Sequence, residues 1–177
     1  MKVVLHICCG VCAAGAASVL LSENHHVIGY FYNPNIFPLS EYDRRLETAR
    51  KTADQLGFVI EAGPYDTEEW TNAVELCKDE PEGGKRCLLC YRLRLEKTLN
   101  FMLERGADLF TSTLTISPRK SADAINIIGR EIGGSRFLSR DFKKKDGFKK
   151  AIELAKQWEL YRQDYCGCIY SLRGGDK

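Results

Sequence analysis

Val3-Val4-Leu5-His6-Ile7-Cys8-Cys9-Gly10-Val11-Cys12 is the stretch that decides the fold. Residues 3–7 are a short apolar run of the kind that buried parallel strands show. After the cysteines, an Ala-rich segment that ends near Asn24 has helical character. The stretch therefore predicts a buried strand, a turn that carries three cysteines, and a helix.

The apolar segment 3–21 is also about long enough to cross a bilayer. A secretory signal has a more basic start and a small-residue cleavage site, whereas here only Lys2 precedes the segment and His6 interrupts it. We therefore expect a cytoplasmic protein with no membrane partner. A chain of 177 residues with 44% hydrophobic and 28% charged residues fits one globular domain over residues 1–177.

Strand and helix alternate along the rest of the chain. Strands are predicted over residues 27–32, 58–61 and 109–113, with a short fifth strand near Phe137. Helices are predicted from Ser40 to Gly57, over 68–78 and 88–105, from Ser117-Pro118 to about Ile132, and over 148–158. This alternation predicts an α/β fold with a Rossmann-like, doubly wound parallel sheet.

In such sheets ligands bind beyond the carboxyl ends of the strands, at the switch point of the topology. Cys8 and Cys9, the loop 33–38 and the segment 113–117 all follow predicted strands. We expect these loops to line one crevice.

The chain has eight cysteines, too many for chance in a protein from a reducing compartment. Seven of them form three groups: Cys8, Cys9 and Cys12; Cys87 and Cys90; Cys166 and Cys168. Spacing alone makes structural zinc as reasonable as iron, but the first group lies in a strand-to-helix turn, where α/β enzymes keep their chemistry. Seven thiols exceed the four that one cluster or zinc needs. Cys77 stands alone and is predicted to be a small buried hydrophobe.

A disulfide between Cys166 and Cys168 would be strained and labile, because only one residue separates them. The formal net charge of only +2 does not by itself indicate a nucleic-acid partner. Two basic runs, 85–97 and 140–150, could simply be solvated helix faces. Their position beside cysteine motifs favours a phosphate-bearing substrate instead.

Several long motifs resemble the QueH-type epoxyqueuosine reductases. They are His6-Ile7-Cys8-Cys9-Gly10-Val11-Cys12, Tyr32-Asn33-Pro34-Asn35-Ile36, residues 80–92 with Cys87-Leu88-Leu89-Cys90, Ile116-Ser117-Pro118, residues 140–144, and residues 160–171 with Cys166-Gly167-Cys168. The resemblance extends along nearly the whole chain. One departure is Gly10-Val11, where the family usually has Ala-Pro; it changes the stiffness of the turn and leaves its thiols in place.

The resemblance implies cobalamin-independent reduction of epoxyqueuosine to queuosine at wobble position 34 of tRNAs with GUN anticodons. It also implies a [4Fe–4S] cluster, a second iron nearby, and an adenine-nucleotide α-hydrolase-like fold. Cys8-Cys9-Gly10 replaces the phosphate-binding loop expected of such a fold, so we predict no use of ATP. The electrons must come from a donor outside the chain.

We predict that Cys8, Cys9, Cys87 and Cys90 hold the cluster. Cys12, Cys166 and Cys168 would serve an adjacent iron or a dithiol/disulfide relay, and Cys12 could exchange roles with Cys9. Asp141 is predicted to be a proton donor or a second-metal ligand, with a helix cap or surface acid as the alternative.

Substrate contacts are predicted on the switch-point loop and in the basic runs. Tyr32, Asn33 and Asn35 either contact the base or cyclopentane ring or simply form a turn. Phe37 or Tyr91 either stacks on an anticodon base or belongs to the core. His6 is predicted to be a hydrogen-bonded core histidine. The predicted phosphate contacts are Lys85, Arg86, Arg92, Arg140, Lys143 and Lys144.

Two other classes of protein fit parts of the pattern. The first is a zinc-stabilised nucleic-acid-binding module without catalysis. The second is an ATP-dependent tRNA-thiolating enzyme, in which the cluster carries sulfur; the missing phosphate loop argues against it.

Overall fold

The run that opens the chain forms the central strand β1 (Lys2–His6), and four of its five residues are buried. β1 pairs in parallel with β2 (His26–Phe31) on one side and with β4 (Leu109–Ser112) on the other. β2 pairs with β3 (Val59–Ala62), so the strand order is β3-β2-β1-β4. The computed structural model describes residues 1–172. Within them the predicted doubly wound parallel sheet is confirmed.

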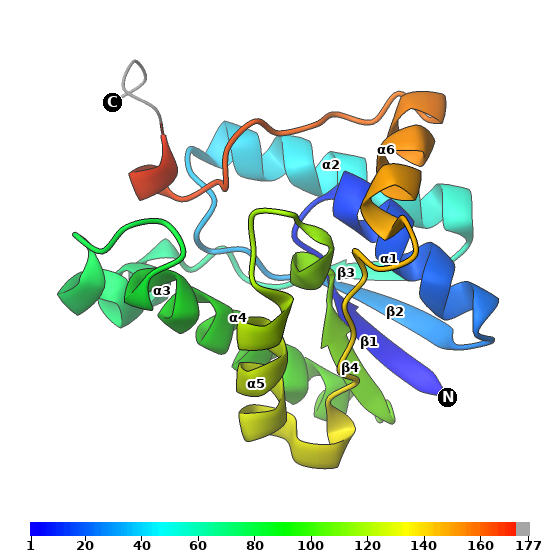
Figure 1. Cartoon of the computed structure of the whole chain (residues 1–177), viewed down its shortest axis with the longest axis horizontal. Coiled ribbons are helices and arrows are strands. Elements are labelled where there is room, and N and C mark those ends of the chain that lie inside the picture. The colour runs from blue at the N-terminus through cyan, green and yellow to red at the C-terminus, as the bar shows by residue number, and fades with distance from the viewer. Residues whose placement is uncertain (173–177) are drawn as a thin grey trace.

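Helices cover both faces of the sheet (Figure 1). One face carries α1 (Gly10–Ser22), α2 (Leu39–Leu56) and α6 (Gly147–Gln157); the other carries α3 (Thr67–Val74), α4 (Lys85–Glu104) and α5 (Ala122–Gly133). Four 3₁₀ turns cover Glu75–Cys77, Thr113–Ile116, Gly134–Arg136 and Ile169–Ser171. An apolar core forms on each face of the sheet. Val3 and Leu5 belong to one core and Val4 to the other, because successive side chains of a strand point to opposite faces.

Local chemistry sets several helix ends. Gly57 ends α2 in the left-handed conformation, with φ of 72°, and its N–H donates to Ala53 O. The Asp66 carboxylate accepts the N–H of Glu69 at 2.9 Å and begins α3, while the Ser121 hydroxyl accepts the N–H of Ala124 at 3.2 Å and begins α5. Such side chains satisfy N–H groups that have no partner inside the helix.

Several predicted boundaries were wrong. Ser117-Pro118 does not begin α5, because Thr113–Ile116 forms a 3₁₀ turn and Ser121 caps the helix instead. α2 begins at Leu39 after Pro38, without a side-chain cap from Ser40. α4 begins at Lys85, three residues before the predicted start, and α3 ends at Val74 with a 3₁₀ turn after it.

The predicted fifth strand is only an isolated parallel bridge between Phe110 and Phe137. The Leu138 N–H donates to Phe110 O at 2.8 Å, but the chain then turns away. A short segment therefore covers the edge of the sheet next to β4. The switch point of the topology lies between β1 and β4. Cys8 follows β1 and Thr113 follows β4 at that point.

Candidate metal and substrate site

The first cysteine group lies in the turn between β1 and α1. Cys9 is the N-cap of α1, and its Sγ accepts the Cys12 N–H at 3.4 Å. The Sγ atoms of Cys8, Cys9 and Cys12 all lie within 4.8 Å of one another. Thr113 fixes Cys8 from the neighbouring strand, because the Cys8 N–H donates to Thr113 Oγ1 at 3.1 Å and this hydroxyl lies 3.2 Å from Cys8 Sγ. One turn thus presents three thiols to the same small volume.

The other four thiols of the three groups meet across α4 and the C-terminal segment. Because α4 begins at Lys85, Cys87 lies in its first turn, where its Sγ accepts the Gly83 N–H at 3.2 Å. Cys87, Cys90, Cys166 and Cys168 line one small cavity. Cys90 and Cys168 also pack together with Trp70.

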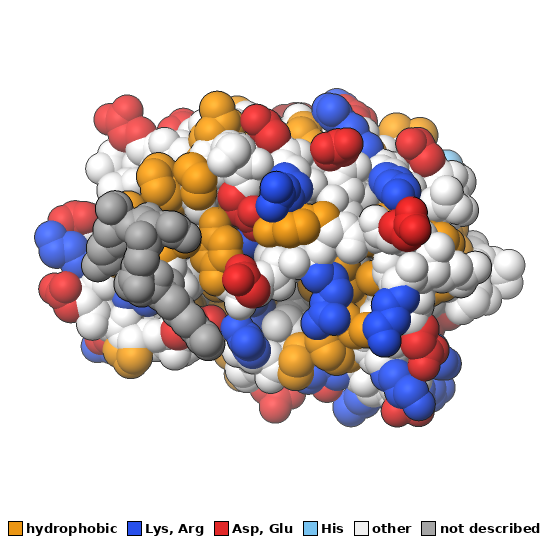
Figure 2. All heavy atoms as spheres, turned by 90° about the horizontal axis from the view of Figure 1, so that it is seen from above, with side chains coloured by type: hydrophobic (Ala, Val, Ile, Leu, Met, Phe, Trp, Pro, Cys, Tyr) orange, Lys and Arg blue, Asp and Glu red, His pale blue; other side chains and the backbone are white. Residues whose placement is uncertain are grey.

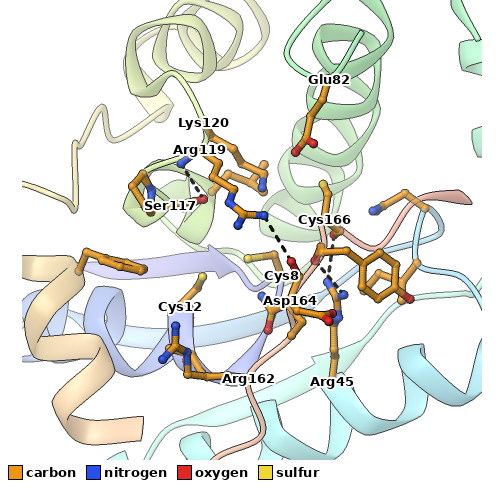
Figure 3. A pocket seen from close by; sticks show the side chains of 18 of the residues that line it. Cys8, Cys12, Arg45, Glu82, Ser117, Arg119, Lys120, Arg162, Asp164 and Cys166 are labelled. Carbon is orange, nitrogen blue, oxygen red and sulfur yellow. Dashed lines mark hydrogen bonds between the residues drawn. The ribbon is translucent and has the colours of Figure 1, made fainter. Parts of the chain in front are cut away.

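A larger cavity of about 620 Å³ joins these two groups. Cys8, Cys12 and Cys166 line it, and Cys166 lines the smaller cavity as well. Figure 3 shows these three sulfurs around the cavity, with chain segments that are far apart in the sequence. The predicted convergence of N-terminal, middle and C-terminal thiols beyond the carboxyl ends of the strands is therefore present.

The C-terminal segment that carries Cys166 is fixed by Arg45 of α2. Its guanidinium donates to Cys166 O at 3.0 Å and to Tyr165 O at 3.2 Å, while its Nε donates to Glu41 Oε1 at 2.6 Å. Gly167 lies beside this contact with φ of +113°, in a region that favours glycine. The buried Arg45–Glu41 pair thus sets the position of one thiol.

Five cations also line the large cavity: Arg45, Arg94, Arg119, Lys120 and Arg162. Among residues 1–172, only two acids line it, Glu82 and Asp164. Arg119 is held at the mouth, where its guanidinium donates to Asp164 O at 3.3 Å (Figure 3). The cavity therefore suits an anionic ligand, although the face seen in Figure 2 mixes basic, acidic and apolar side chains.

These cations act on the thiols. Hydrogen bonds with Cys12 and Cys9, together with the charges of Arg94 and Lys120, hold the pKa of Cys8 well below its usual range. The Cys168 thiol, followed by Lys120 and Arg94, lowers the pKa of Cys166 to about 5. Burial opposes the charge of Lys120, but the neighbouring Cys166 and Cys8 raise the pKa of its ammonium group. Both thiols therefore favour the thiolate, which is the form that binds metals.

Cys12 was predicted to serve an iron adjacent to the Cys8 and Cys9 cluster, or to exchange roles with Cys9. Its sulfur lies beside those of Cys8 and Cys9, and its assignment to either role stays a prediction. Cys77 was predicted to be buried, yet it is partly exposed in the 3₁₀ turn Glu75–Cys77. Asp141 does not line the large cavity; its carboxylate lies 3.4 Å from Lys143 Nζ and accepts the Lys143 N–H.

Tyr32 and Asn33, next to the switch point, form hydrogen bonds inside the fold. Tyr32 and Asn33 are fully buried, with the Tyr32 hydroxyl donating to Glu69 and the Asn33 amide donating to Ile7 O. Asn35 lines both cavities, and its buried Oδ1 has no hydrogen-bond partner in the part of the chain that the structure describes. Tyr91 belongs to the core, whereas Phe37 is 45% exposed. Asn35 and Tyr91 thus line a cavity, and Phe37 is exposed outside both cavities.

Most predicted phosphate contacts already have partners. Arg86 is buried and donates to Lys78 O and Glu80 O. Arg92 pairs with Glu131, and Arg140 pairs with Glu23 at 2.8 Å. Lys143 Nζ donates to Thr115 O at 3.0 Å and Lys120 O at 3.3 Å, so it fixes the loop that carries Lys120. Lys85 and Lys144 are exposed.

The positively charged residues that line the large cavity were not predicted from the sequence. Arg94 follows Cys87 and Cys90 at the i, i+3 and i+7 spacing of one helix face, a signal that was available. Lys120 and Arg119 lie just after Ser117-Pro118, which was read as a helix start. Arg162 precedes Cys166 in a segment without regular structure, so no periodicity marked it.

Comparisons with known proteins identify relatives of this chain. The family model described as "Epoxyqueuosine reductase QueH" matches residues 3–174. A protein of that name from Thermotoga maritima is 40% identical over 96% of this chain and 90% of its own length. One from Streptococcus pyogenes is 36% identical over 97% of this chain and 71% of its own.

Solved structures match in fold at low sequence identity. The U34-tRNA thiolase NcsA from Methanococcus maripaludis, solved with its [4Fe–4S] cluster, has a TM-score of 0.61 and 17% identity; the match covers 98% of this chain and 62% of that one. A predicted tRNA methyltransferase subunit from Methanocaldococcus jannaschii has a TM-score of 0.58 and 17% identity, over 88% and 74% of the two chains. These matches show that the chain shares its α/β fold with both proteins. In the described part of the chain, each helix is too short or too polar to span a membrane.

Proposed function

Because this chain belongs to the QueH family of epoxyqueuosine reductases, we propose that it reduces epoxyqueuosine to queuosine at wobble position 34 of GUN-anticodon tRNAs in the cytoplasm. The observation that carries this proposal is Cys166, which lines both cavities and so joins the thiols of all three cysteine groups. An enzyme of this family acts as an oxidoreductase, and the joined cavities give a reducible centre direct access to a ligand.

The donor set fits iron. Iron–sulfur clusters are held by cysteine thiolates, and Cys8, Cys9 and Cys12 place three sulfurs within 4.8 Å of one another. This grouping favours a [4Fe–4S] cluster held by these three thiols with a fourth ligand from Cys87 or Cys90. The ligand set predicted from the sequence, Cys8, Cys9, Cys87 and Cys90, also stays a prediction. In that set Cys12 would serve the adjacent iron or the dithiol/disulfide relay. When bound, such a centre supplies electrons one at a time.

The remaining thiols line the small cavity, and Cys166 lines the large cavity as well. Cys166 and Cys168, with whichever of Cys87 and Cys90 is left, are proposed to hold a mononuclear iron or to act as a redox-active pair. The low pKa of Cys166, about 5, keeps its sulfur as the thiolate at neutral pH. Asp141 stays a predicted proton donor or metal ligand, and reaching the cavity would require it to leave Lys143.

The reaction has a fixed balance. Converting the epoxide to an alkene breaks two C–O bonds, takes two electrons and two protons, and releases the oxygen as water. The electrons come from an external reductant. The chain's own contribution is to place a cation beside the oxygen as negative charge develops on it, and the Lys120 ammonium, half-buried in the cavity near Cys8 and Cys166, suits this role.

The lining of the large cavity also offers contacts for a nucleotide. A nucleotide that enters from an anticodon loop brings a bulky modified base and its flanking phosphates. We propose that the base occupies the cavity near Asn35, whose Oδ1 lacks a partner, and that the exposed Arg119 and Arg162 at the mouth bind the phosphates. The exposed Lys85 and Lys144 extend this contact, and Phe37 is placed to stack on an exposed base.

The test is anaerobic purification followed by iron and sulfide analysis and an assay on epoxyqueuosine-bearing tRNA with a chemical reductant. We expect a brown protein and conversion of the nucleoside to queuosine. Colourless protein that contains only zinc and leaves the nucleoside unchanged would favour the nucleic-acid-binding alternative. Sulfur incorporation dependent on ATP would favour the thiolating alternative.

Two cysteine variants sharpen the test. Replacement of Cys87 by serine is expected to lower iron content and abolish turnover. Cys77→Ser is the matched control, because Cys77 lines neither cavity; it is expected to keep iron and activity. Full iron and activity in Cys87→Ser would contradict the assignment of Cys87 as a ligand.

A further inference from the structure

Arg94 lies at the centre of α4, between the two groups of thiols. It is 2% exposed and lines both cavities together with Cys166. Its guanidinium donates to Cys90 Sγ at 3.9 Å. A fixed positive charge therefore lies between sulfurs that come from three separate parts of the chain.

The other partners of Arg94 carry no charge. Its Nε donates to His6 Nε2 at 3.3 Å, and its terminal nitrogen donates to Asn33 Oδ1 at 2.5 Å. Because His6 Nε2 accepts this hydrogen bond, that nitrogen carries no proton and the imidazole is neutral. Among the ion pairs of residues 1–172, none includes Arg94.

The other buried arginines differ. Arg45 has Glu41 as its partner at 2.6 Å. Arg86 also has no ion pair among residues 1–172, but its guanidinium donates to Lys78 O and Glu80 O and lies over the ring of Tyr170. A buried charge without a counter-charge is strongly unfavourable, and a guanidinium cannot lose its proton to avoid this cost. Arg94 therefore requires an anion, and the anionic groups that surround it are the thiolates of the site.

We propose that Arg94 is the internal counter-ion of the thiolate site and that it raises the reduction potential of the iron centre held there. This inference rests on the proposed function, because it assumes that the thiols hold iron. Each added electron makes the centre more negative by one charge, so a nearby cation stabilises the reduced form more than the oxidised form. Arg94 is thus a positioning residue that acts through the sulfurs.

The direct test removes the charge. Arg94→Gln is expected to lower the equilibrium constant for one-electron reduction at least tenfold, which is about 59 mV for a one-electron couple. Arg94→Lys keeps the charge and is expected to shift it less. Arg105→Gln is the matched control: it removes the same charge from the end of the same helix, 11 residues and roughly 16 Å further along, and is expected to change nothing. The readout is spectroelectrochemical titration of anaerobically purified protein, with iron and sulfide content measured on the same sample.

A second variant neutralises the charge without removing the arginine. Asn33→Asp places a carboxylate at the atom that already accepts from Arg94, with almost no change in side-chain size. It is expected to lower the reduction equilibrium constant in the same direction as Arg94→Gln. If Arg94→Gln does not fold, Asn33→Asp tests the counter-ion role of Arg94 in its place.

The outcomes separate this inference from the proposed function. Wild-type protein without iron, or without reductase activity, would overturn the proposed function. A wild-type protein that holds iron and reduces epoxyqueuosine, with variants of unchanged potential, would overturn only the counter-ion role. If the charge-removing variants fold but lose iron, rescue of iron content by Arg94→Lys supports the inference, and equal loss in Arg94→Lys overturns it in favour of a purely geometric role.

Discussion

The sulfur of Cys9 accepts the main-chain N–H of Cys12 at 3.4 Å, so a candidate metal ligand is also the N-cap of α1. Hydrogen bonds with Cys12 lower the pKa of Cys9, but the Cys8 thiol and burial outweigh them and raise it to about 12. The cap therefore fixes the position of the sulfur, and metal binding must displace its proton. The cap also places Cys8 and Cys12 on either side of Cys9, which explains how one turn presents three sulfurs.

The two roles of Cys9 can be separated by substitution. Serine can cap the helix but binds iron poorly, whereas alanine can do neither. We expect both Cys9→Ser and Cys9→Ala to lose iron, and metal-free Cys9→Ala to be less stable than metal-free Cys9→Ser by about 1 kcal/mol. Urea denaturation under reducing conditions measures the difference. Equal stability would exclude the cap, and full iron content in Cys9→Ser would exclude the ligand.

Gly10 allows α1 and α2 to approach closely at the site. A Cβ atom there would lie 2.4 Å from Thr48 Cγ2 and 2.6 Å from Thr48 O. We expect Gly10→Ala to lower the free energy of unfolding by about 1–3 kcal/mol, the usual range for overpacking. Because the clash includes a main-chain oxygen, adding Thr48→Ser should restore little of the loss. Full recovery in the double variant, measured by urea denaturation, would show that only the Thr48 methyl group matters.

His6 gives the fold a defined acid sensitivity. Its folded pKa is lowered from 6.5 to about 3, chiefly by burial and then by Arg94. The unfolded chain therefore binds a proton below pH 6.5 that the folded protein does not bind. Stability is unaffected by this group above pH 6.5, and it falls as the pH drops from 6.5 towards 3, by up to about 1.4 kcal/mol per pH unit.

The measurement is the free energy of unfolding of metal-free protein between pH 7 and pH 4. His6→Gln is expected to show a shallower fall than the wild type over this interval, because the group that takes up the proton is gone. His26→Gln is the control, since His26 is exposed at the start of β2. Parallel pH profiles for wild type and His6→Gln would exclude this contribution of His6.

The parallel sheet could be predicted because its signal is local and strong. Residues 3–7 are a continuous apolar run, and the order of strands and helices limits the topology to a doubly wound sheet. The start of α5 could not be placed, because Ser121 and Ser117 offer equal capping chemistry and only tertiary packing selects between them. The fifth strand failed for a similar reason, since one bridge at Phe137 depends on β4 and not on local propensity.

The thiols of the site could be predicted from their number and spacing, but their partition could not. Whether Cys12 belongs with Cys9 depends on the conformation of a single turn, which its pattern of residues does not determine. The partners of the basic residues could not be predicted from the sequence either. Arg86 and Lys143 are near cysteine motifs in the sequence, yet main-chain carbonyls take up their donors. Charge near a motif does not reveal whether a side chain already has a partner.

The buried pair of Glu41 and Arg45 links α2 to the Cys166 segment. Removing one member of a buried pair leaves an uncompensated charge, which typically costs about 3–5 kcal/mol. We expect Arg45→Gln to destabilise the protein by that order and to lower iron content by releasing the Cys166 carbonyl. The double variant Glu41→Gln/Arg45→Gln should recover part of the stability but not the iron.

Thermal unfolding and iron analysis of the three proteins test this division of roles. Recovery of iron together with stability in the double variant would show that Arg45 acts only through its charge balance with Glu41, and not by holding Cys166 in place.

Arg119 and Arg162 lie at the mouth of the large cavity, where both are exposed. If each neutralises one phosphate, binding of tRNA falls with salt, and the slope of log K against log salt concentration should decrease by about one for each alanine substitution. Arg105→Ala removes the same charge at the opposite end of α4 from the cysteines and should leave the slope unchanged. The measurement is tRNA affinity at several salt concentrations for the three variants and the wild type. An unchanged slope in Arg119→Ala and Arg162→Ala would place the phosphate contacts elsewhere, with the exposed Lys85 and Lys144 next to be tested.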